Sequence, residues 1–359
     1  MLGADSTLFI YQLINDSAAL LYSTVLTDEV LLLQIGDADN DGENDLVAVT
    51  GRKRYQKTEV KVYLIDQEKN EWQIEKLYSK YSARPQATSM IIANYPDEDK
   101  QSIIVSYFES KYLVETVVIT QNDDSWNSEV LSVKRMAMTR DVGVLDWDKK
   151  GDPKAEMAVG RVYGDEIGML GDACIFGSDN IYLPSKRGVK AVKIGDGDND
   201  RENEIYIGDG WHQDYGKIAR GRLAEIDHRN SDITYELIED VKYQYETSQI
   251  EIADINSDGL NEVITRGNRF IRIYQKGKED WMVFTDSLLP VKQFCIGDVS
   301  GDKHPELIFA GPKVKLFNLG NLEFSTDLGE GIVTEPISPD SIIGEAAPEL
   351  SMLTQVENT

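Results

Sequence analysis

Four short segments of the chain carry carboxylate, amide or, in one case, hydroxyl side chains at positions one, three, five and nine of a loop. In the first segment these residues are Asp37, Asp39, Asp41 and Asp45. Several oxygen ligands on a short, turn-rich loop are typical of Ca²⁺, which takes about six to eight oxygens. The spacing therefore predicts a calcium loop, with the backbone carbonyl of Glu43 as a fifth ligand. A solvated acidic turn is the alternative interpretation.

Three other segments repeat this pattern and are named here by their place among the repeats. The fourth loop offers Asp196, Asp198, Asp200 and Glu204, the fifth offers Asp254, Asn256, Asp258 and Glu262, and the sixth offers Asp298, Ser300, Asp302 and Glu306. Arg201 and Lys303 replace the turn glycine in the fourth and sixth loops, and we expect them to weaken cation binding there. The sequence thus predicts about four structural Ca²⁺ sites.

These loops are not EF-hands. An EF-hand places a bidentate Glu at position twelve and continues into a helix. Here position twelve is Ala48, Ile207, Thr265 or Phe309, and the residues that follow the loop have the pattern of a strand.

Three weaker copies complete the series. The second, which begins at Asn94, lacks the first Asp and the Gly, and the seventh is truncated near Glu345, so we expect neither to hold a metal. The third offers Asp146, Asp148, Asp152 and Glu156 but contains two extra residues. It is a potential fifth site if that insertion bulges, although Lys150 and Lys154 add competing charge.

The seven copies define a repeat with anchors at 37, 94, 146, 196, 254, 298 and 345. In the first copy, apolar or alternating segments at 30–35, 46–50, 59–65 and 72–78 predict four strands, separated by Gly, Asn and Asp. Four short strands in every repeat are typical of β-propeller blades. We therefore predict an all-β, seven-bladed β-propeller of four-stranded blades; an open β-solenoid is the runner-up.

The two ends of the chain supply complementary halves of one blade. The seventh repeat has room for only two strands, at 341–344 and 350–353, and two further strands are expected at 8–13 and 19–25. We predict a single domain, 1–359, closed by pairing of the N-terminal with the C-terminal strands. The last blade is then shared between 1–29 and 331–359.

The composition excludes some classes of partner. The chain has 37 Lys and Arg against 63 Asp and Glu, a net charge of −26, which argues against nucleic acid or an anionic membrane. No apolar run approaches the roughly 18 residues of a membrane span, and the first residues lack a secretory signal pattern. Cys174 and Cys295 lie in apolar stretches and read as buried small hydrophobes.

The loops resemble a known repeat family. Apolar-Gly-Asp-x-Asp-x-Asp-Gly-x-x-Asp/Glu, followed by a strand that ends in Gly, is similar to the FG-GAP/VCBS repeats of integrin α-subunit-like propellers. Residues 46–51 and 307–311 show the strand best. The resemblance covers essentially the whole chain and implies structural Ca²⁺ in the four intact loops. It also implies that ligands bind on the opposite face, which is built from the loops between the second and third strands and between successive blades.

Cationic and aromatic residues are expected on that opposite face. The candidate ligand-binding residues are Trp211, His212, Tyr215, Arg52 and Arg161. We expect Trp211 in a loop between strands at 205–207 and 219–226. Arg binds carboxylates through two hydrogen bonds, and aromatic rings stack on sugars, so an anionic or carbohydrate partner fits. Scattered solubilising charges are the alternative.

Two functional classes remain open. We favour a non-catalytic recognition or adhesion module that binds a carbohydrate or protein ligand over a carbohydrate-active enzyme such as a polysaccharide lyase. Calcium loops of this kind suit the high Ca²⁺ concentration outside cells, so we expect an extracellular or cell-surface location. No residues are assigned to catalysis.

Overall fold

The structure is a computed structural model in which the chain is described over several ranges. These are residues 6–14, 17–52, 58–68, 71–82, 86–96, 99–110, 112–122, 125–135, 137–145, 154–161, 173–176, 181–183, 188–211, 220–229, 232–242, 247–267, 270–277, 281–288, 293–297, 305–310, 314–318 and 351–352. Within them the secondary structure is almost entirely β-strand. No helix in these ranges is long and apolar enough to cross a membrane.

The strands follow the repeat in order. They are β1 (Thr7–Ile14), β2 (Ser17–Val25), β3 (Glu29–Gly36), β4 (Asp45–Gly51), β5 (Thr58–Glu68), β6 (Glu71–Ser82), β7 (Ala87–Asn94), β8 (Gln101–Phe108), β9 (Leu113–Asn122), β10 (Ser125–Arg135), β11 (Ala137–Leu145), β12 (Lys154–Arg161), β13 (Ala173–Phe176) and β14 (Ile181–Leu183). They continue with β15 (Gly188–Gly195), β16 (Glu204–Trp211), β17 (Arg220–Arg229), β18 (Asp232–Lys242), β19 (Thr247–Ala253), β20 (Glu262–Gly267), β21 (Phe270–Lys276), β22 (Trp281–Leu288), β23 (Gln293–Gly297), β24 (Glu306–Ala310), β25 (Val314–Asn318) and β26 (Ser351–Met352).

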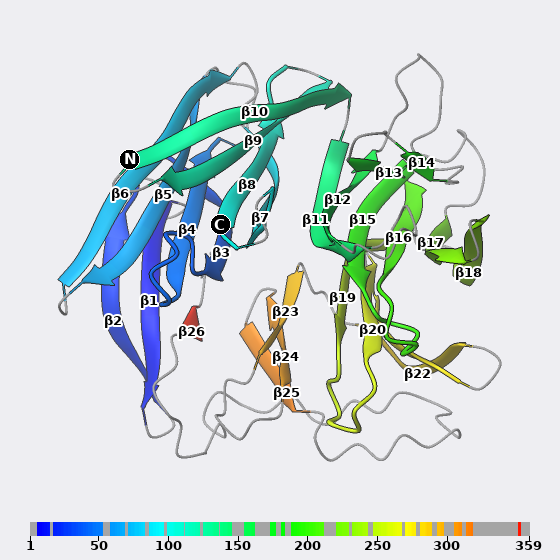
Figure 1. The fold of residues 1–359 in the computed structure, drawn as a ribbon. Coiled ribbons are helices and arrows are strands. Elements are labelled where there is room, and N and C mark those ends of the chain that lie inside the picture. Colours follow the sequence, from blue (N-terminus) through cyan, green and yellow to red (C-terminus); the bar gives the residue numbers. More distant parts are fainter. Residues whose placement is uncertain are drawn as a thin grey trace. The chain divides into compact units, whose positions relative to one another are not determined.

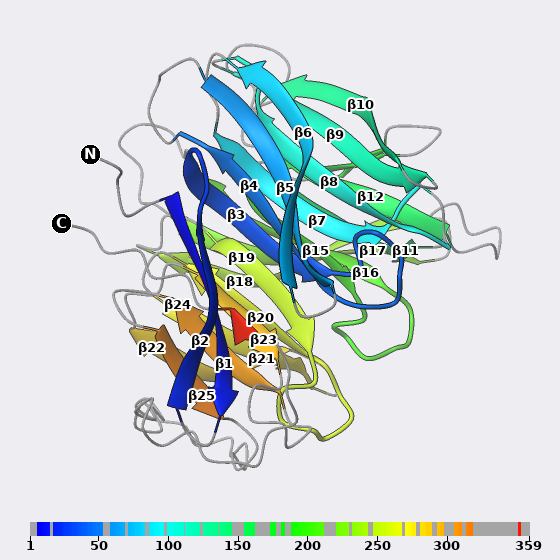
Figure 2. The ribbon, with the colours of Figure 1, turned by 90° about the vertical axis from the view of Figure 1, so that its left-hand side faces the viewer.

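Consecutive strands pair into separate sheets (Figures 1 and 2). The described strands form five four-stranded sheets, β3–β6, β7–β10, β11–β14, β15–β18 and β19–β22, and two three-stranded sheets, β23–β25 and β2-β1-β26. In each four-stranded sheet the strands lie in the order in which they occur in the chain. This repetition of small meander sheets is a β-propeller arrangement, as the sequence predicted.

The chain divides into two compact units. One contains Met1–Leu8, Val25–Ile194 and His228–Ile233, and the other contains Phe9–Thr24, Gly195–Asp227 and Thr234–Thr359. In the first unit, β3 contacts β7 and β7 contacts β11, so the first strands of successive sheets are neighbours. In the second unit, β19 contacts β23 in the same way.

Aliphatic side chains from neighbouring sheets form the core. In the first unit, buried residues of β4 and β5, such as Val49 and Val62, pack in one cluster with Ile103 of β8 and Val117 of β9. In the second unit, Ile264 and Ile273 cluster with Phe294 of the next sheet. A blade therefore buries its faces against its neighbours, which is why one repeat cannot stand alone.

The glycine that ends the first strand is required by close approach of the next sheet. A Cβ atom on Gly36 would lie 2.9 Å from Cγ2 of Ile92 in β7. In the second unit, a Cβ atom on Gly195 would lie 3.1 Å from Cδ1 of Ile252. The apolar-Gly-Asp pattern thus combines a packing requirement with the start of the acidic loop.

The structure agrees with most predicted strands and corrects one boundary. The four strands expected in the first repeat are β3 to β6, and those expected at 8–13 and 19–25 are β1 and β2. The sequence placed Trp211 in a loop after a strand that ends at residue 207. Instead β16 continues to Trp211, and Asp209 pairs with Arg222 of β17. The β16–β17 hairpin extends beyond the apolar residues 205–207, because backbone pairing does not need apolar side chains.

The N-terminal and C-terminal segments meet in one sheet. β1 pairs antiparallel with β26, with Ile10 opposite Met352 and Tyr11 opposite Ser351. The strand expected at 341–344 lies outside the described residues.

Candidate metal centres

The acidic loops share a backbone conformation that their residues permit. Gly42 and Gly259 have φ angles of 93° and 86°, and Arg201 occupies the same place with φ 77°. Among the described residues, no atom lies within 4 Å of a Cβ built on either glycine, so the left-handed backbone explains these glycines. Arg201 adopts this conformation at a cost of about 1–2 kcal/mol, the amount for an ordinary L-residue.

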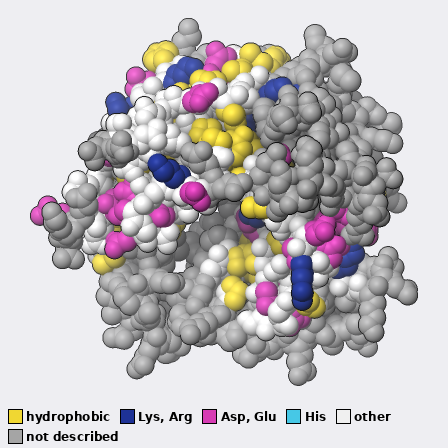
Figure 3. All heavy atoms as spheres, in the orientation of Figure 1, with side chains coloured by type: hydrophobic (Ala, Val, Ile, Leu, Met, Phe, Trp, Pro, Cys, Tyr) yellow, Lys and Arg dark blue, Asp and Glu magenta, His cyan; other side chains and the backbone are white. Residues whose placement is uncertain are grey.

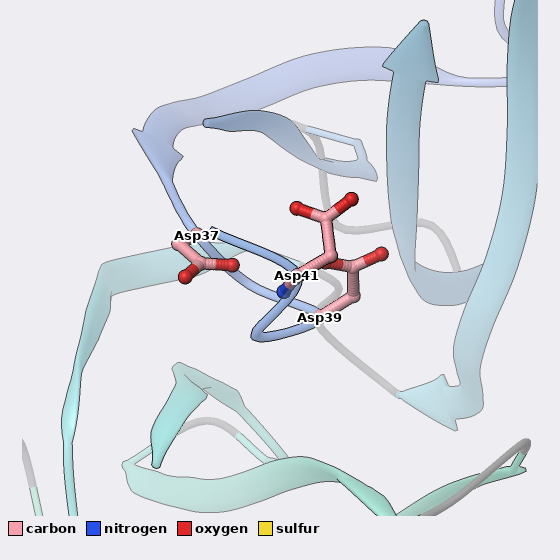
Figure 4. Close-up of side chains that lie close together, drawn as sticks. All are labelled: Asp37, Asp39 and Asp41. Carbon is pink, nitrogen blue, oxygen red and sulfur yellow. Dashed lines mark hydrogen bonds between the residues drawn. The ribbon is translucent and has the colours of Figure 1, made fainter. Parts of the chain in front are cut away.

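Three carboxylates of the first loop converge (Figure 4). One oxygen each from Asp37, Asp39 and Asp41 lies within 4.8 Å of the others. Gly42 N–H donates to Asp37 Oδ2 at 3.2 Å. The second oxygen, Asp37 Oδ1, is buried and has no hydrogen-bond donor among the described residues. An orphaned buried oxygen costs about 1–3 kcal/mol, and a bound cation would remove that cost.

The ninth residue of the first loop is buried beneath this cluster. Asp45 is 3% exposed, and its Oδ2 accepts the N–H of Ala38 at 2.9 Å and of Asp39 at 3.3 Å. Burial, together with the charge of Asp39, raises the pKa of Asp45 to about 7. Burial and neighbouring carboxylates also raise the pKa of Asp39. The loop therefore concentrates mutually repelling carboxylates, an arrangement that favours a divalent cation.

The fourth loop shows the same features with deeper burial. Oxygens of Asp196, Asp198 and Glu204 lie within 4.8 Å of one another. Asp196 Oδ1 and Glu204 Oε1 are buried without a donor in the described part of the chain. Burial, then the charge of Asp198, raises the pKa of Glu204 to about 9. Asp196, Asp198 and Glu204 thus form a second cluster of candidate oxygen ligands.

A lysine and a further glutamate adjoin the fourth loop. Lys276 Nζ of β21 lies 3.1 Å from Asp198 Oδ2 and 3.5 Å from Glu225 Oε1. Tyr206 donates its hydroxyl to Glu225 Oε2 at 3.2 Å. Burial raises the pKa of Glu225 to about 7, although Lys276 opposes the shift. Lys276 thus neutralises part of the charge around this loop.

The fifth loop is built differently. Each carboxylate oxygen of Asp254, Asp258 and Glu262 accepts a hydrogen bond from a backbone or side-chain amide. Asn256 Nδ2 donates to Glu262 Oε1 at 3.0 Å and to Asp258 Oδ2 at 3.2 Å. Burial and the charges of Asp258 and Asp254 raise the pKa of Glu262 to about 8. This loop carries the predicted ligands, but internal donors already satisfy them.

Several predicted ligands lie outside the described residues. They are Asp298, Ser300 and Asp302 of the sixth loop and Asp146, Asp148 and Asp152 of the third. Glu306 begins β24, and Glu156 is buried in β12. Glu43, predicted to contribute its carbonyl, is exposed, and its N–H donates to Asp41 Oδ1 at 2.8 Å.

Strand pairing brings one further residue, on the third strand of the sheet, next to position nine of the acidic loop, and the spacing of the motif did not indicate it. In β24 and β25, Glu306 lies opposite Asn318. Asp66 and Gln275 follow Ile65 and Tyr274, the partners of Leu46 and Val263, so they occupy the equivalent third-strand place. Asp227 follows Ile226, the partner of Ile205, in the same way. In the first, fourth and fifth repeats a carboxylate or amide residue thus stands across from position nine on the third strand, whereas the second repeat has Thr120 there.

The predicted ligand-binding residues are only partly described. Arg52 lies after β4 with its side chain 48% exposed, and its Nε is 3.6 Å from Asp28 Oδ1. Arg161 is 2% exposed at the end of β12, so its guanidinium lies among protein atoms. Trp211 is placed by its backbone at the end of β16. His212 and Tyr215 lie outside the described residues.

In the first unit, other side chains are exposed at the strand ends opposite the acidic loops. Tyr81, near the end of β6, is 65% exposed, and Tyr112, just before β9, is 45% exposed. On the face shown in Figure 3, both acidic and basic side chains appear among the described residues, so that face is not uniformly acidic.

Comparisons with known proteins relate the chain to others by fold. No protein-family model matches the chain, and no curated protein matches its sequence. It is similar to the crystal structure of Sqt1 from Chaetomium thermophilum, with 12% identity over 89% of this chain and 78% of that one and a TM-score of 0.55. It is also similar to a structure of BBS1N in complex with ARL6DN, soaked with mercury, with 14% identity, coverage of 80% and 77%, and a TM-score of 0.47. The likeness to Sqt1 is one of fold and agrees with the β-propeller arrangement.

Proposed function

We propose that the chain is a cation-stabilised β-propeller that serves as a recognition module. The observation that carries this proposal is the pair of carboxylate clusters in the first and fourth loops, with Asp37 Oδ1, Asp196 Oδ1 and Glu204 Oε1 buried without donors in the described structure. Loops in a rigid scaffold that keep such groups together need a compensating positive charge.

Calcium suits these loops better than other cations. The candidate ligands are carboxylate oxygens, which suit a hard cation. Mg²⁺ demands a tighter geometry and keeps several waters, and softer metals prefer His or Cys. The resemblance to FG-GAP/VCBS repeats supports the same choice. An extracellular or cell-surface location, where Ca²⁺ is abundant, follows as part of this proposal.

The recognition surface is proposed at the strand ends opposite the acidic loops. Strands alternate in direction within a blade, so the loops after β4 and β8 leave from the end opposite the first acidic loop. This end of the first unit carries the exposed Tyr81 and Tyr112 and the partly exposed Arg52. Aromatic and cationic side chains of this kind suit a protein or carbohydrate ligand.

A seven-bladed ring closed by both termini is the architecture we propose for this module. The seven repeats of the sequence and the pairing of β1 with β26 support it. Deleting residues 1–25 should expose a strand edge and cause aggregation or unfolding. A soluble truncation with unchanged melting temperature would contradict the closure.

The calcium part of the proposal is tested by thermal melting of the full chain in EDTA, Ca²⁺ and Mg²⁺. Each cation bound only by the native state adds about 2.7 kcal/mol at a hundredfold excess over its Kd. We expect a lower melting temperature in EDTA and better recovery with Ca²⁺ than with Mg²⁺. Equal melting temperatures in all three conditions would contradict it.

The recognition part is tested separately with glycan and protein arrays in the presence of Ca²⁺. A ligand found in this way should lose affinity when Tyr81→Ala and Tyr112→Ala are combined, with melting unchanged. Glu71→Gln, at the acidic-loop end of β6, serves as the matched exposed control. Retained binding by the tyrosine double variant would place the ligand elsewhere.

A further inference from the structure

We infer that Gln275 is a positioning residue that holds the fifth loop together in place of a cation, so that cation dependence is concentrated in the first and fourth loops. This inference rests on the proposed function, because it concerns how unequally the loops use Ca²⁺.

Gln275 directly contacts two predicted ligands of the fifth loop. Its Nε2 donates to Glu262 Oε1 and to Asp258 Oδ2, each at 3.0 Å. Gln275 is 8% exposed and Glu262 is fully buried, so solvent does not compete with these bonds. Hydrogen bonds from an amide to a buried carboxylate are stronger than those between neutral groups.

Asn256 completes the same arrangement. Its Nδ2 also donates to Glu262 Oε1 and Asp258 Oδ2, while its Oδ1 accepts the N–H of Asp258 at 2.8 Å. The backbone contact fixes the orientation of the amide, because a flipped amide would turn its oxygen toward two carboxylates. Two side-chain amides thus supply four N–H···O contacts at the place where carboxylate oxygens of the other loops converge.

The first and fourth loops have no such amide at the third-strand place. Asp66 and Asp227 stand there instead, and each adds a carboxylate to a loop that already has four acidic ligands. Asp66 is close enough to raise the pKa of both Asp39 and Asp45. The unsatisfied oxygens of Asp37, Asp196 and Glu204 belong to these two loops. The third-strand residue therefore distinguishes loops that need a cation from one that does not.

A consequence for affinity follows from this difference. A cation that enters the fifth loop must displace the amide donors from Glu262 and Asp258, so Gln275 stabilises the metal-free loop and weakens binding. Replacing Gln275 should destabilise the metal-free protein more than the Ca²⁺-loaded protein. An ordinary packing role would instead destabilise both forms equally.

The test is thermal melting of full-length Gln275→Met and Gln275→Glu, each in EDTA and in excess Ca²⁺. For the isosteric Gln275→Met we expect a loss of roughly 3–6 °C in EDTA and most of it regained in Ca²⁺. Gln275→Glu, which copies the charge of the first loop, should lose more in EDTA and regain it in Ca²⁺. The reverse change in the first loop, Asp66→Asn, puts an amide at the third-strand place. It should reduce the difference in melting temperature between EDTA and Ca²⁺.

The outcomes separate this inference from the calcium proposal. When Ca²⁺ raises the melting temperature of the wild type, an equal loss in EDTA and Ca²⁺ for Gln275→Met, or no loss in EDTA, would overturn the inference. If wild-type melting ignores Ca²⁺ but Gln275→Met still melts earlier in EDTA, the anchoring by Gln275 stands and the calcium proposal fails.

Discussion

Asn40 and Gln101 are joined by two reciprocal hydrogen bonds that connect the first acidic loop to the next sheet. Asn40 Nδ2 donates to Gln101 O at 3.2 Å, and Gln101 N–H donates to Asn40 Oδ1 at 2.6 Å. In the second unit, Asn199 and Asn261 make the same pair of bonds at 3.1 and 2.6 Å. In both loops the residue at position four therefore forms hydrogen bonds with the backbone of the residue at position eight of the next repeat.

The conformation of the fourth position suits this contact. Asn40 and Asn199 have φ angles of 64° and 67°, and Asn tolerates this left-handed region better than most residues. In the sixth repeat the eighth position is Pro305, which has no N–H to donate, and the fourth position of the fifth loop is Ser257 rather than Asn. The acidic loop thus makes hydrogen bonds across the junction between neighbouring sheets.

The first prediction concerns this junction. Asn40→Asp should reduce the free energy of unfolding by about 1–2 kcal/mol, because it removes the donor to Gln101 O while keeping a side chain that tolerates positive φ. Asn40→Gly should lose both bonds without backbone strain. Urea unfolding in excess Ca²⁺ measures both. If neither variant is destabilised, the two bonds contribute nothing to the junction.

The second prediction concerns the packing of Gly36. Gly36→Ala should be destabilising by about 1–3 kcal/mol, because the new Cβ would meet Ile92 at 2.9 Å and force the sheets apart. Gly195→Ala is the comparison variant and should lose less, since its Cβ would meet the end of the Ile252 side chain, Cδ1, at 3.1 Å. Denaturant unfolding of both variants provides the comparison, and equal losses would contradict a specific clash at Gly36.

Much of the fold could be predicted from the sequence because the repeat carries it. The acidic motif located β3 and β4, the first two strands of the first repeat, and alternation along 59–65 located β5. The end of β16 was misplaced, since Gly208 and Asp209 read as loop residues although their backbones pair with β17. Local residue type is a poor guide where a hairpin extends beyond the apolar core.

The candidate metal loops could also be predicted, but the differences between them could not. Position and residue type identified the ligands, whereas the third-strand neighbours follow only from pairing. Gln275 stands 13 residues after Glu262, but Asp66 stands 21 after Asp45, because the intervening hairpins differ in length. Sequence reasoning also ranked the fifth loop with the first, although Gln275 and Asn256 already satisfy the oxygens of Glu262 and Asp258.

The third prediction compares single loops. Asp37→Asn and Asp196→Asn should each remove part of the stabilisation by Ca²⁺, because each deletes a ligand charge, while the amide oxygen still accepts the loop N–H. Asp254→Asn should remove less of the stabilisation by Ca²⁺, because Gln275 already anchors the fifth loop. The difference in melting temperature between EDTA and Ca²⁺ is the quantity to measure. Identical effects of all three variants would contradict the unequal use of the loops.

The fourth prediction is a pH dependence of the metal-free protein. Glu204 and Glu262 have pKa values raised from 4.5 to about 9 and about 8. Between the unfolded pKa of 4.5 and these raised values, the folded state holds protons that the unfolded state has released. The free energy of unfolding in EDTA should therefore fall as the pH rises from about 5 to 9. Below the unfolded pKa both states are protonated and this contribution is constant.

Calcium should reverse this trend, because it binds the ionised carboxylates. The test measures the free energy of unfolding in urea at about pH 5.5, 7 and 8.5, in Ca²⁺ and in EDTA. The gap between the two values should widen as the pH rises. A gap that is constant or narrows with pH would contradict the placement of Glu204 at a cation.

Direct titration of metal-stripped protein with Ca²⁺, followed calorimetrically at neutral pH, tests the central claim most directly. We expect saturable binding of more than one ion, with the tighter class of sites lost in the double variant Asp37→Asn, Asp196→Asn and retained in the control Glu71→Gln. Absence of saturable binding by the wild-type chain, or an unchanged titration in the double variant, would contradict it.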